Sequence, residues 1–104
     1  MRVERVVDTG LEYVPGDRVV VHVVQRDRRT TITDEGAAVA RAGRPAGWRD
    51  VARAIEDDLI VNVGRSGRIF LPCVPKGPDA DEVVRRIGEA SLALYQDLLE
   101  LASS

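Results

Sequence analysis

The sequence predicts a single α+β domain: an antiparallel sheet of four or five strands, with a long C-terminal helix across one face and two short helices at the side. Three observations support this class. β-branched residues near the N-terminus form short runs separated by turn residues, which is typical of paired strands. Small residues suited to short helices occupy the middle, and a continuous apolar stripe of helical period follows them. The 104 residues leave room for one core and no second domain.

The N-terminal strands are predicted from valine-rich runs. The first strand is expected over Val3–Thr9, followed by a connection whose turn is Pro15-Gly16-Asp17. Arg18–Arg26 carries apolar residues on both of its faces, so we expect it to lie centrally in the sheet. After a turn at Asp27-Arg28-Arg29, the segment Arg29–Thr33 returns antiparallel and completes a hairpin.

A strand meets a helix start at Thr30–Gly36 with no loop between them. Thr33 or Asp34 is expected to cap a short helix of small residues, with the carboxylates of Asp34 and Glu35 in its first turn. Gly43 should end that helix. The same carboxylates could bind a divalent metal or serve in acid–base chemistry. Capping is the favoured interpretation, because a helix N-terminus stabilises ionised carboxylates.

A second helix is predicted from Pro45 or Gly47 to Asp57, with Trp48 as a core anchor. A second hairpin follows this helix. Leu59–Val63 and Arg68–Leu71 are its strands, and Gly64-Arg65-Ser66-Gly67 is its turn. Pro72 and Pro75 then interrupt the ladder, so the second strand should end there or lie at an edge.

The last helix is predicted to begin at Asp79, which forms a capping-box pattern with Glu82. At about 22 residues, or roughly 33 Å, this helix would cross the whole domain and contribute most of the core. Leu92 falls outside its main apolar stripe, so a partner subunit could bury it, or it could be an ordinary exposed residue. The predicted stripe consists of Val83, Val84, Ile87, Ala90, Ser91, Leu94, Tyr95, Leu98 and Leu101.

Composition argues against several functions. The net charge of −2 neither attracts nor strongly repels nucleic acid, and no apolar run is long enough to span a bilayer. Cys73 is the only cysteine and His22 the only histidine, so a disulfide, a cysteine-based zinc site and a catalytic triad lack partners. We therefore expect a cytoplasmic, non-enzymatic protein without a metal or cofactor.

Arginine supplies all but one of the 15 basic residues. Arg26, Arg28 and Arg29 crowd the first hairpin, and Arg65 and Arg68 flank the turn of the second. If both turns point the same way, these side chains form a basic rim for phosphates or an acidic partner; otherwise they form a solvated charged surface. The glycines around Arg65 are similar to a phosphate-clamping loop, although a hairpin turn explains them without a ligand.

One short motif resembles a known family. Asp17, Val19 and Val21, followed by Ile32–Gly36, are similar to an uncharacterised bacterial family with an Asp-x-Ile/Val strand and then a Leu-Thr-Asp-Asp-Gly-type hairpin end. Glu35 replaces the usual second aspartate, and the resemblance covers roughly Asp17–Leu99. Members often occur with phage and mobile-element genes. The resemblance implies the fold, and it implies no activity or site residue.

The sequence therefore favours a small non-catalytic interaction module that binds another protein or its own copy as a homodimer. Its expected surface includes the five hairpin arginines and Leu92. The alternative is a nucleic-acid-associated protein that uses the arginine-rich hairpin turns.

Overall fold

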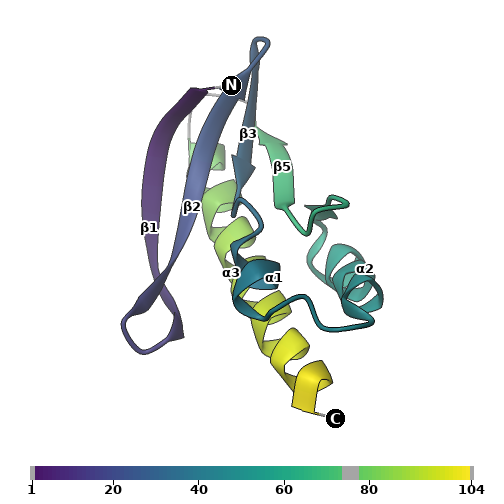
Figure 1. The fold of residues 1–104 in the computed structure, drawn as a ribbon. Coiled ribbons are helices and arrows are strands. Elements are labelled where there is room, and N and C mark those ends of the chain that lie inside the picture. The colour runs from purple at the N-terminus through teal and green to yellow at the C-terminus, as the bar shows by residue number, and fades with distance from the viewer. Residues whose placement is uncertain (1, 74–77, 104) are drawn as a thin grey trace.

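The computed structural model describes residues 2–73 and 78–103 and confirms the α+β class (Figure 1). Five antiparallel strands form one sheet in the order β1-β2-β3-β5-β4. The strands are β1 (Arg2–Val14), β2 (Asp17–Arg26), β3 (Arg29–Thr33), β4 (Asn62–Val63) and β5 (Ile69–Cys73), and the helices are α1 (Ala37–Arg41), α2 (Trp48–Leu59) and α3 (Pro78–Ser103).

β1 is longer than the sequence predicted. Irregular pairing between Asp8 and Glu12 lets the strand continue through Gly10, whose φ is 81°. A bulge of this kind absorbs extra residues without ending the ladder. The hydroxyl of Thr9 also donates to the carbonyl of Val19 at 2.7 Å, which ties the irregular segment to β2. The predicted long connection to β2 is therefore wrong, and only a tight turn at Pro15 and Gly16 separates the strands.

β3 matches its predicted bounds, β2 begins one residue earlier than predicted, at Asp17, and β2 is paired on both sides. The turn residues Asp27 and Arg28 have φ angles of 49° and 65°. Two left-handed residues form the turn that best matches the twist of the flanking strands.

The second hairpin differs from its prediction at both strands. Leu59 belongs to α2, so β4 is reduced to two residues that pair with Phe70 and Ile69. β5 continues past Pro72, which pairs with Thr31 of β3. Proline is tolerated there because β4 is too short to reach that part of β5, whose second side is a sheet edge.

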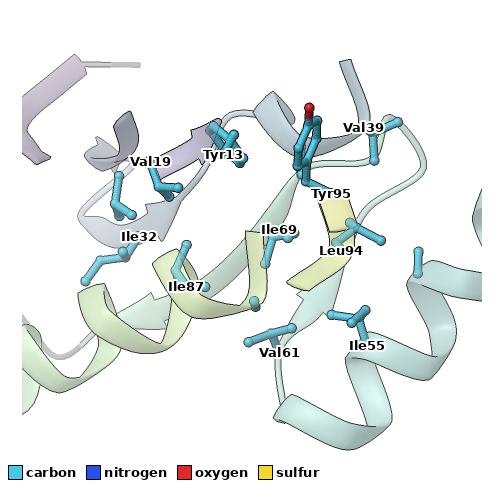
Figure 2. Packing of buried hydrophobic residues seen from close by; sticks show 14 of the residues in the cluster. Tyr13, Val19, Ile32, Val39, Ile55, Val61, Ile69, Ile87, Leu94 and Tyr95 are labelled. Carbon is cyan, nitrogen blue, oxygen red and sulfur yellow. The ribbon is translucent and has the colours of Figure 1, made fainter. Parts of the chain in front are cut away.

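α3 is the main source of the core, as predicted. It contacts β1, β2, β3 and β5 and continues beyond the sheet, where α1 and α2 pack against it (Figure 1). Gly88 permits close packing, because a Cβ there would lie 2.9 Å from the Thr9 side chain. Figure 2 shows side chains from the sheet and the helices gathered in this core. Its buried members are Tyr13, Val19, Val21, Val23, Ile32, Ala38, Val39, Ala52, Ile55, Val61, Ile69, Val84, Ile87, Ala90, Leu94, Tyr95 and Leu98.

Some predictions concern positions that the structure does not describe. The side chains of Cys73 and Asp79 and the whole of Pro75 lie outside the described part of the chain. Trp48, the predicted core anchor, is only half-buried and packs against the edge of the core. Among the described residues, no helix is both long and apolar enough to span a bilayer.

Ile60 follows α2 in a left-handed conformation, with φ 55° and ψ 57°. Its side chain is 71% exposed, so it contributes little burial in return. A left-handed residue other than glycine costs roughly 1–2 kcal/mol, partly offset by the greater freedom of glycine in the unfolded chain. We expect Ile60→Gly to raise the free energy of unfolding by roughly 0.5–1 kcal/mol in urea titrations.

Ile60→Ala serves as the control, because it removes the side chain but keeps the backbone strain. Equal stability of the glycine and alanine variants would contradict a role for the backbone conformation.

Candidate interaction surface

One face of the sheet carries apolar side chains that the core does not use. Alternate residues of β2 point in opposite directions, so Val19, Val21 and Val23 face α3 and enter the core. Val20 and Val24 lie on the other face. We call this second surface the helix-free face, since α3 covers the opposite side of the sheet.

Strand register aligns the side chains of the helix-free face into rows. One row crosses all five strands through Val6, His22, Thr33, Phe70 and Asn62. Residues that pair across antiparallel strands share a face and lie close enough to interact.

A second row consists of Val3, Val24, Thr31 and Pro72. Val3 is exposed and does not pack against the core, whereas Val24 is buried, with 2% exposure, although it lies outside the main core cluster. Apolar residues on both faces of β2 thus predicted its central position, with a neighbouring strand on each side. They did not predict that α3 would cover only one face of the sheet.

Exposure is greatest at the β1 side of this face. The side chains of Val3 and Val6 are 46% and 56% exposed, high values for valines in a paired strand. Exposed apolar surface marks interaction sites in soluble proteins when it forms a contiguous patch.

His22 lies on β2 in the first row, between Val6 and Thr33. Its Nδ1 atom is buried and has no hydrogen-bond partner among the described residues. A buried polar atom without a partner costs roughly 1–3 kcal/mol. The neighbours that register places beside it are Val6 and Thr33, which offer no catalytic partner.

Arg68 closes one part of the helix-free face. Its Nε donates to Oγ1 of Thr33 at 3.1 Å, and its guanidinium lies 3.5 Å from the carboxylate of Glu35. Its Cζ lies 6.0 Å from the centroid of the Phe70 ring. Arg68 thus helps to bury Thr33, which no helix covers, and it borders an open depression of about 530 Å³ shared with Arg29.

The two arginine-rich turns lie at opposite ends of the β3–β5 pair. Thr30 pairs with Cys73 near the first turn, whereas Thr33 pairs with Phe70 near the second. Antiparallel pairing therefore separates Arg28 from Arg65, and the condition for a shared basic rim is not met. Of the predicted surface residues, only Arg29 and Arg68 line a common depression.

The remaining predicted surface residues are less informative. The side chain of Arg26 lies outside the described part of the structure. Leu92 is half-buried and packs against the core of its own chain.

Asp34 is fully buried and does not cap α1 in the predicted way. Gly36 occupies the N-cap position of α1, and no acidic residue lies in the first turn. Glu35 and Gly36 adopt left-handed conformations, with φ angles of 58° and 77°, and thereby delay the helix start. The prediction missed these two residues because neither the carboxylates nor the glycine indicates how many residues the turn takes.

The carboxylate of Asp34 instead joins three parts of the fold. Its Oδ1 accepts the backbone N–H groups of Gly36 at 2.9 Å and Ile69 at 3.0 Å. Its Oδ2 accepts the hydroxyl of Ser91 at 2.7 Å and, weakly, the N–H of Ala38 at 3.5 Å. The β3 end, the β5 start and α3 therefore meet at one side chain.

A hydroxyl chain extends from this carboxylate to β1. Ser91 Oγ lies 2.7 Å from the hydroxyl of Tyr13, whose ring contacts Tyr95 edge-on at 5.2 Å and the Arg41 guanidinium at 4.5 Å. Burial raises the pKa of the Asp34 carboxyl, while the Ser91 and backbone hydrogen bonds lower it. Burial also raises the pKa of Tyr13. These buried groups are inaccessible to a substrate, so they stabilise the fold.

Sequence reasoning missed this network because its members are far apart in the chain. Ser91 is 57 residues from Asp34 and 78 from Tyr13. The available signal was Ser91 itself, a polar residue inside an apolar helical stripe. No group of three or more potential metal ligands occurs among the described residues.

Comparison with known proteins shows no match to a family model, to a curated protein or to a solved structure. The resemblance carried by Asp17 and Ile32–Gly36 therefore stays a prediction.

Replacing Asp34 should test its role in joining the elements. Asp34→Ala leaves the N–H groups of Gly36 and Ile69 buried without an acceptor, so we expect a loss of roughly 2–4 kcal/mol in the free energy of unfolding. Asp34→Asn keeps one acceptor oxygen, and the Ser91 hydroxyl can reorient, so its loss should be clearly smaller. Equal losses for both variants in urea titrations would contradict this account.

The pH dependence of stability should also identify Asp34. Because burial raises its pKa above the ordinary 3.8, the folded protein binds this proton more tightly than the unfolded chain does. The stabilisation that comes from this tighter proton binding is complete below pH 3.8. It is lost as the pH rises through the higher pKa of Asp34 in the folded protein.

The free energy of unfolding of the wild type should therefore increase relative to Asp34→Asn as pH falls from about 7 to about 4.5. Asp17, whose pKa is lowered by its hydrogen bond to Arg41, has the opposite dependence in both proteins and cancels in the comparison. A constant difference between the two proteins over this range would refute the expectation.

Proposed function

We propose that this chain is a non-catalytic protein-interaction module and that its partner is a second copy of itself, docked on the helix-free face. The observation that carries the proposal is the pair of exposed valines Val3 and Val6 on the β1 side of the helix-free face, neither of which packs in the core. Sheets with one apolar face left open are stabilised when another layer covers that face.

The area of this face is compatible with a dimer. The sheet has five strands, so at about 4.8 Å between neighbours its width is roughly 19 Å. From Val20 to Arg26 it extends roughly 20 Å at about 3.4 Å per residue. Because β3, β4 and β5 are short, two such faces give at most roughly 800 Å², which is below the about 1,000 Å² of a stable specific interface and fits a weak, transient dimer.

A second copy also matches the pattern of side chains. Stacked sheets lie about 10 Å apart, and a two-fold axis places the same apolar rows opposite each other. On the β1 side of the face, Val6, His22 and Val24 carry no carboxylate or guanidinium, and Asp8, which pairs with Val20, is the nearest carboxylate among the paired residues of β1. The charged residues Arg29 and Arg68 lie beside the depression, nearer the β5 side.

The nucleic-acid alternative has less support, because it requires the arginine-rich turns to act together. Arg28 and Arg65 lie at opposite ends of the sheet, so they cannot contact one short stretch of phosphates as a single rim.

Sedimentation equilibrium tests the proposed dimer. We expect the wild type to be dimeric at about 100 μM, and Val6→Lys to weaken association at least tenfold, because it places a charge on the most exposed apolar part of the face. The side chain of Val6 is 56% exposed, so the variant should fold normally, which circular dichroism would check.

Leu99→Lys is the matched control. Leu99 is 40% exposed on α3, away from the helix-free face, and this variant should associate like the wild type. A wild type that stays monomeric up to about 1 mM, or two variants that dissociate equally, would overturn self-association through this face.

A further inference from the structure

A second surface feature lies away from the helix-free face. A hollow of about 190 Å³ separates α2 from the turn between β4 and β5. Arg49 and Arg53 line it from α2, and Arg65 lines it from the turn. Trp48 forms part of its wall, and Glu56 is the only carboxylate among its lining residues.

The arginines of this hollow differ from five others in their ion pairing. Five arginines outside the hollow lie within ion-pair distance of a carboxylate, namely Arg18, Arg41, Arg68, Arg85 and Arg86. Within the described residues, Arg49, Arg53 and Arg65 form no ion pair. Three guanidinium groups thus share a small concave site with one carboxylate, which leaves an excess of positive charge there.

The position of α2 increases this positive potential. Arg49 lies in the first turn of α2, where the helix dipole favours negative charge and disfavours a cation. Asp50 in the same turn does not line the hollow. An anion in the hollow would therefore interact favourably with both the guanidinium groups and the helix.

The Trp48 ring holds the guanidinium group of Arg49 in place. The Cζ of Arg49 lies 5.2 Å from the Trp48 ring centroid, and that of Arg44 lies 5.8 Å away. A guanidinium stacked on an aromatic ring keeps its N–H donors available at its edge, in a geometry that suits bidentate binding of phosphate.

The glycines of the adjoining turn have a structural role. The N–H of Gly64 donates to the Arg68 carbonyl at 2.8 Å, and that of Gly67 donates to the Gly64 carbonyl at 3.0 Å. A Cβ on Gly67 would lie 2.7 Å from Val39. Close packing and internal hydrogen bonds thus explain the turn, and any anion site depends on the arginines rather than on a backbone nest.

We infer that this hollow binds a diphosphate anion, with Arg49, Arg53 and Arg65 as donors. Its volume equals that of about six water molecules, which suits one or two phosphate groups and excludes an entire nucleotide. The anion can be free pyrophosphate or the terminal groups of a nucleoside diphosphate whose base remains outside. The site is separate from the helix-free face and does not depend on the proposed dimer.

Trp48 provides the assay, because it is the only tryptophan in the chain. Titration with pyrophosphate at low ionic strength should give a saturable change in tryptophan fluorescence, which isothermal calorimetry confirms independently. We expect Arg53→Gln and Arg65→Gln each to weaken the affinity about tenfold or more, since each removes one charge-assisted contact. Added salt should also weaken binding steeply.

Arg85→Gln is the matched control, since Arg85 is exposed on α3, outside the hollow, and pairs with Glu82 at 2.7 Å. It should bind pyrophosphate like the wild type. Tighter binding of ADP than of pyrophosphate would assign a nucleotide, and equal or weaker binding would assign the free anion.

Absence of saturation by both methods up to about 10 mM would overturn the inference. Equal weakening by Arg85→Gln and Arg53→Gln would also overturn it, because it would show attraction to the overall charge and not to this hollow.

Discussion

The buried carboxylate of Asp34 is the interaction on which the arrangement of the elements depends. Its two oxygens accept donors from the β5 start, from the turn into α1 and from α3. Hydrophobic packing alone would let these elements slide against one another, whereas directional hydrogen bonds to one buried group specify a single register. Ser91 is also hydrogen-bonded to the Tyr13 hydroxyl. This bond connects the long, irregular β1 to the same network that holds the middle of the sheet.

This arrangement leaves the domain with one core and two unequal sheet faces. α3 supplies most of the side chains that cover the inner face, and α1 and α2 pack on α3 beyond the sheet. Val3 and Val6 lie on the face away from α3 and are exposed. A residue such as Val6 can therefore change with little effect on the core.

The sequence was sufficient for features that depend on local pattern. The bounds of Arg29–Thr33 and the apolar stripe of α3 were predicted, because period and turn chemistry determine them. The continuation of β1 through Gly10 and the end of α2 at Leu59 were missed, since bulges and left-handed caps at residues such as Ile60 have no clear local signal. The arrangement of surface residues was harder to predict than the bounds of the helices and strands. Whether Arg28 and Arg65 meet depends on strand order and direction, which only the assembled sheet reveals.

The position of α3 in the chain has a consequence for biosynthesis. Every strand is translated before α3, which contributes more buried core residues than any other element, so the nascent sheet cannot bury Val19, Val21 or Ile32 until α3 emerges from the ribosome. During that interval both faces of the β2–β3 hairpin expose apolar side chains. Newly made chains on neighbouring ribosomes are thus exposed to one another's strands at this stage, when unpaired edges and apolar surface promote aggregation and chaperone binding.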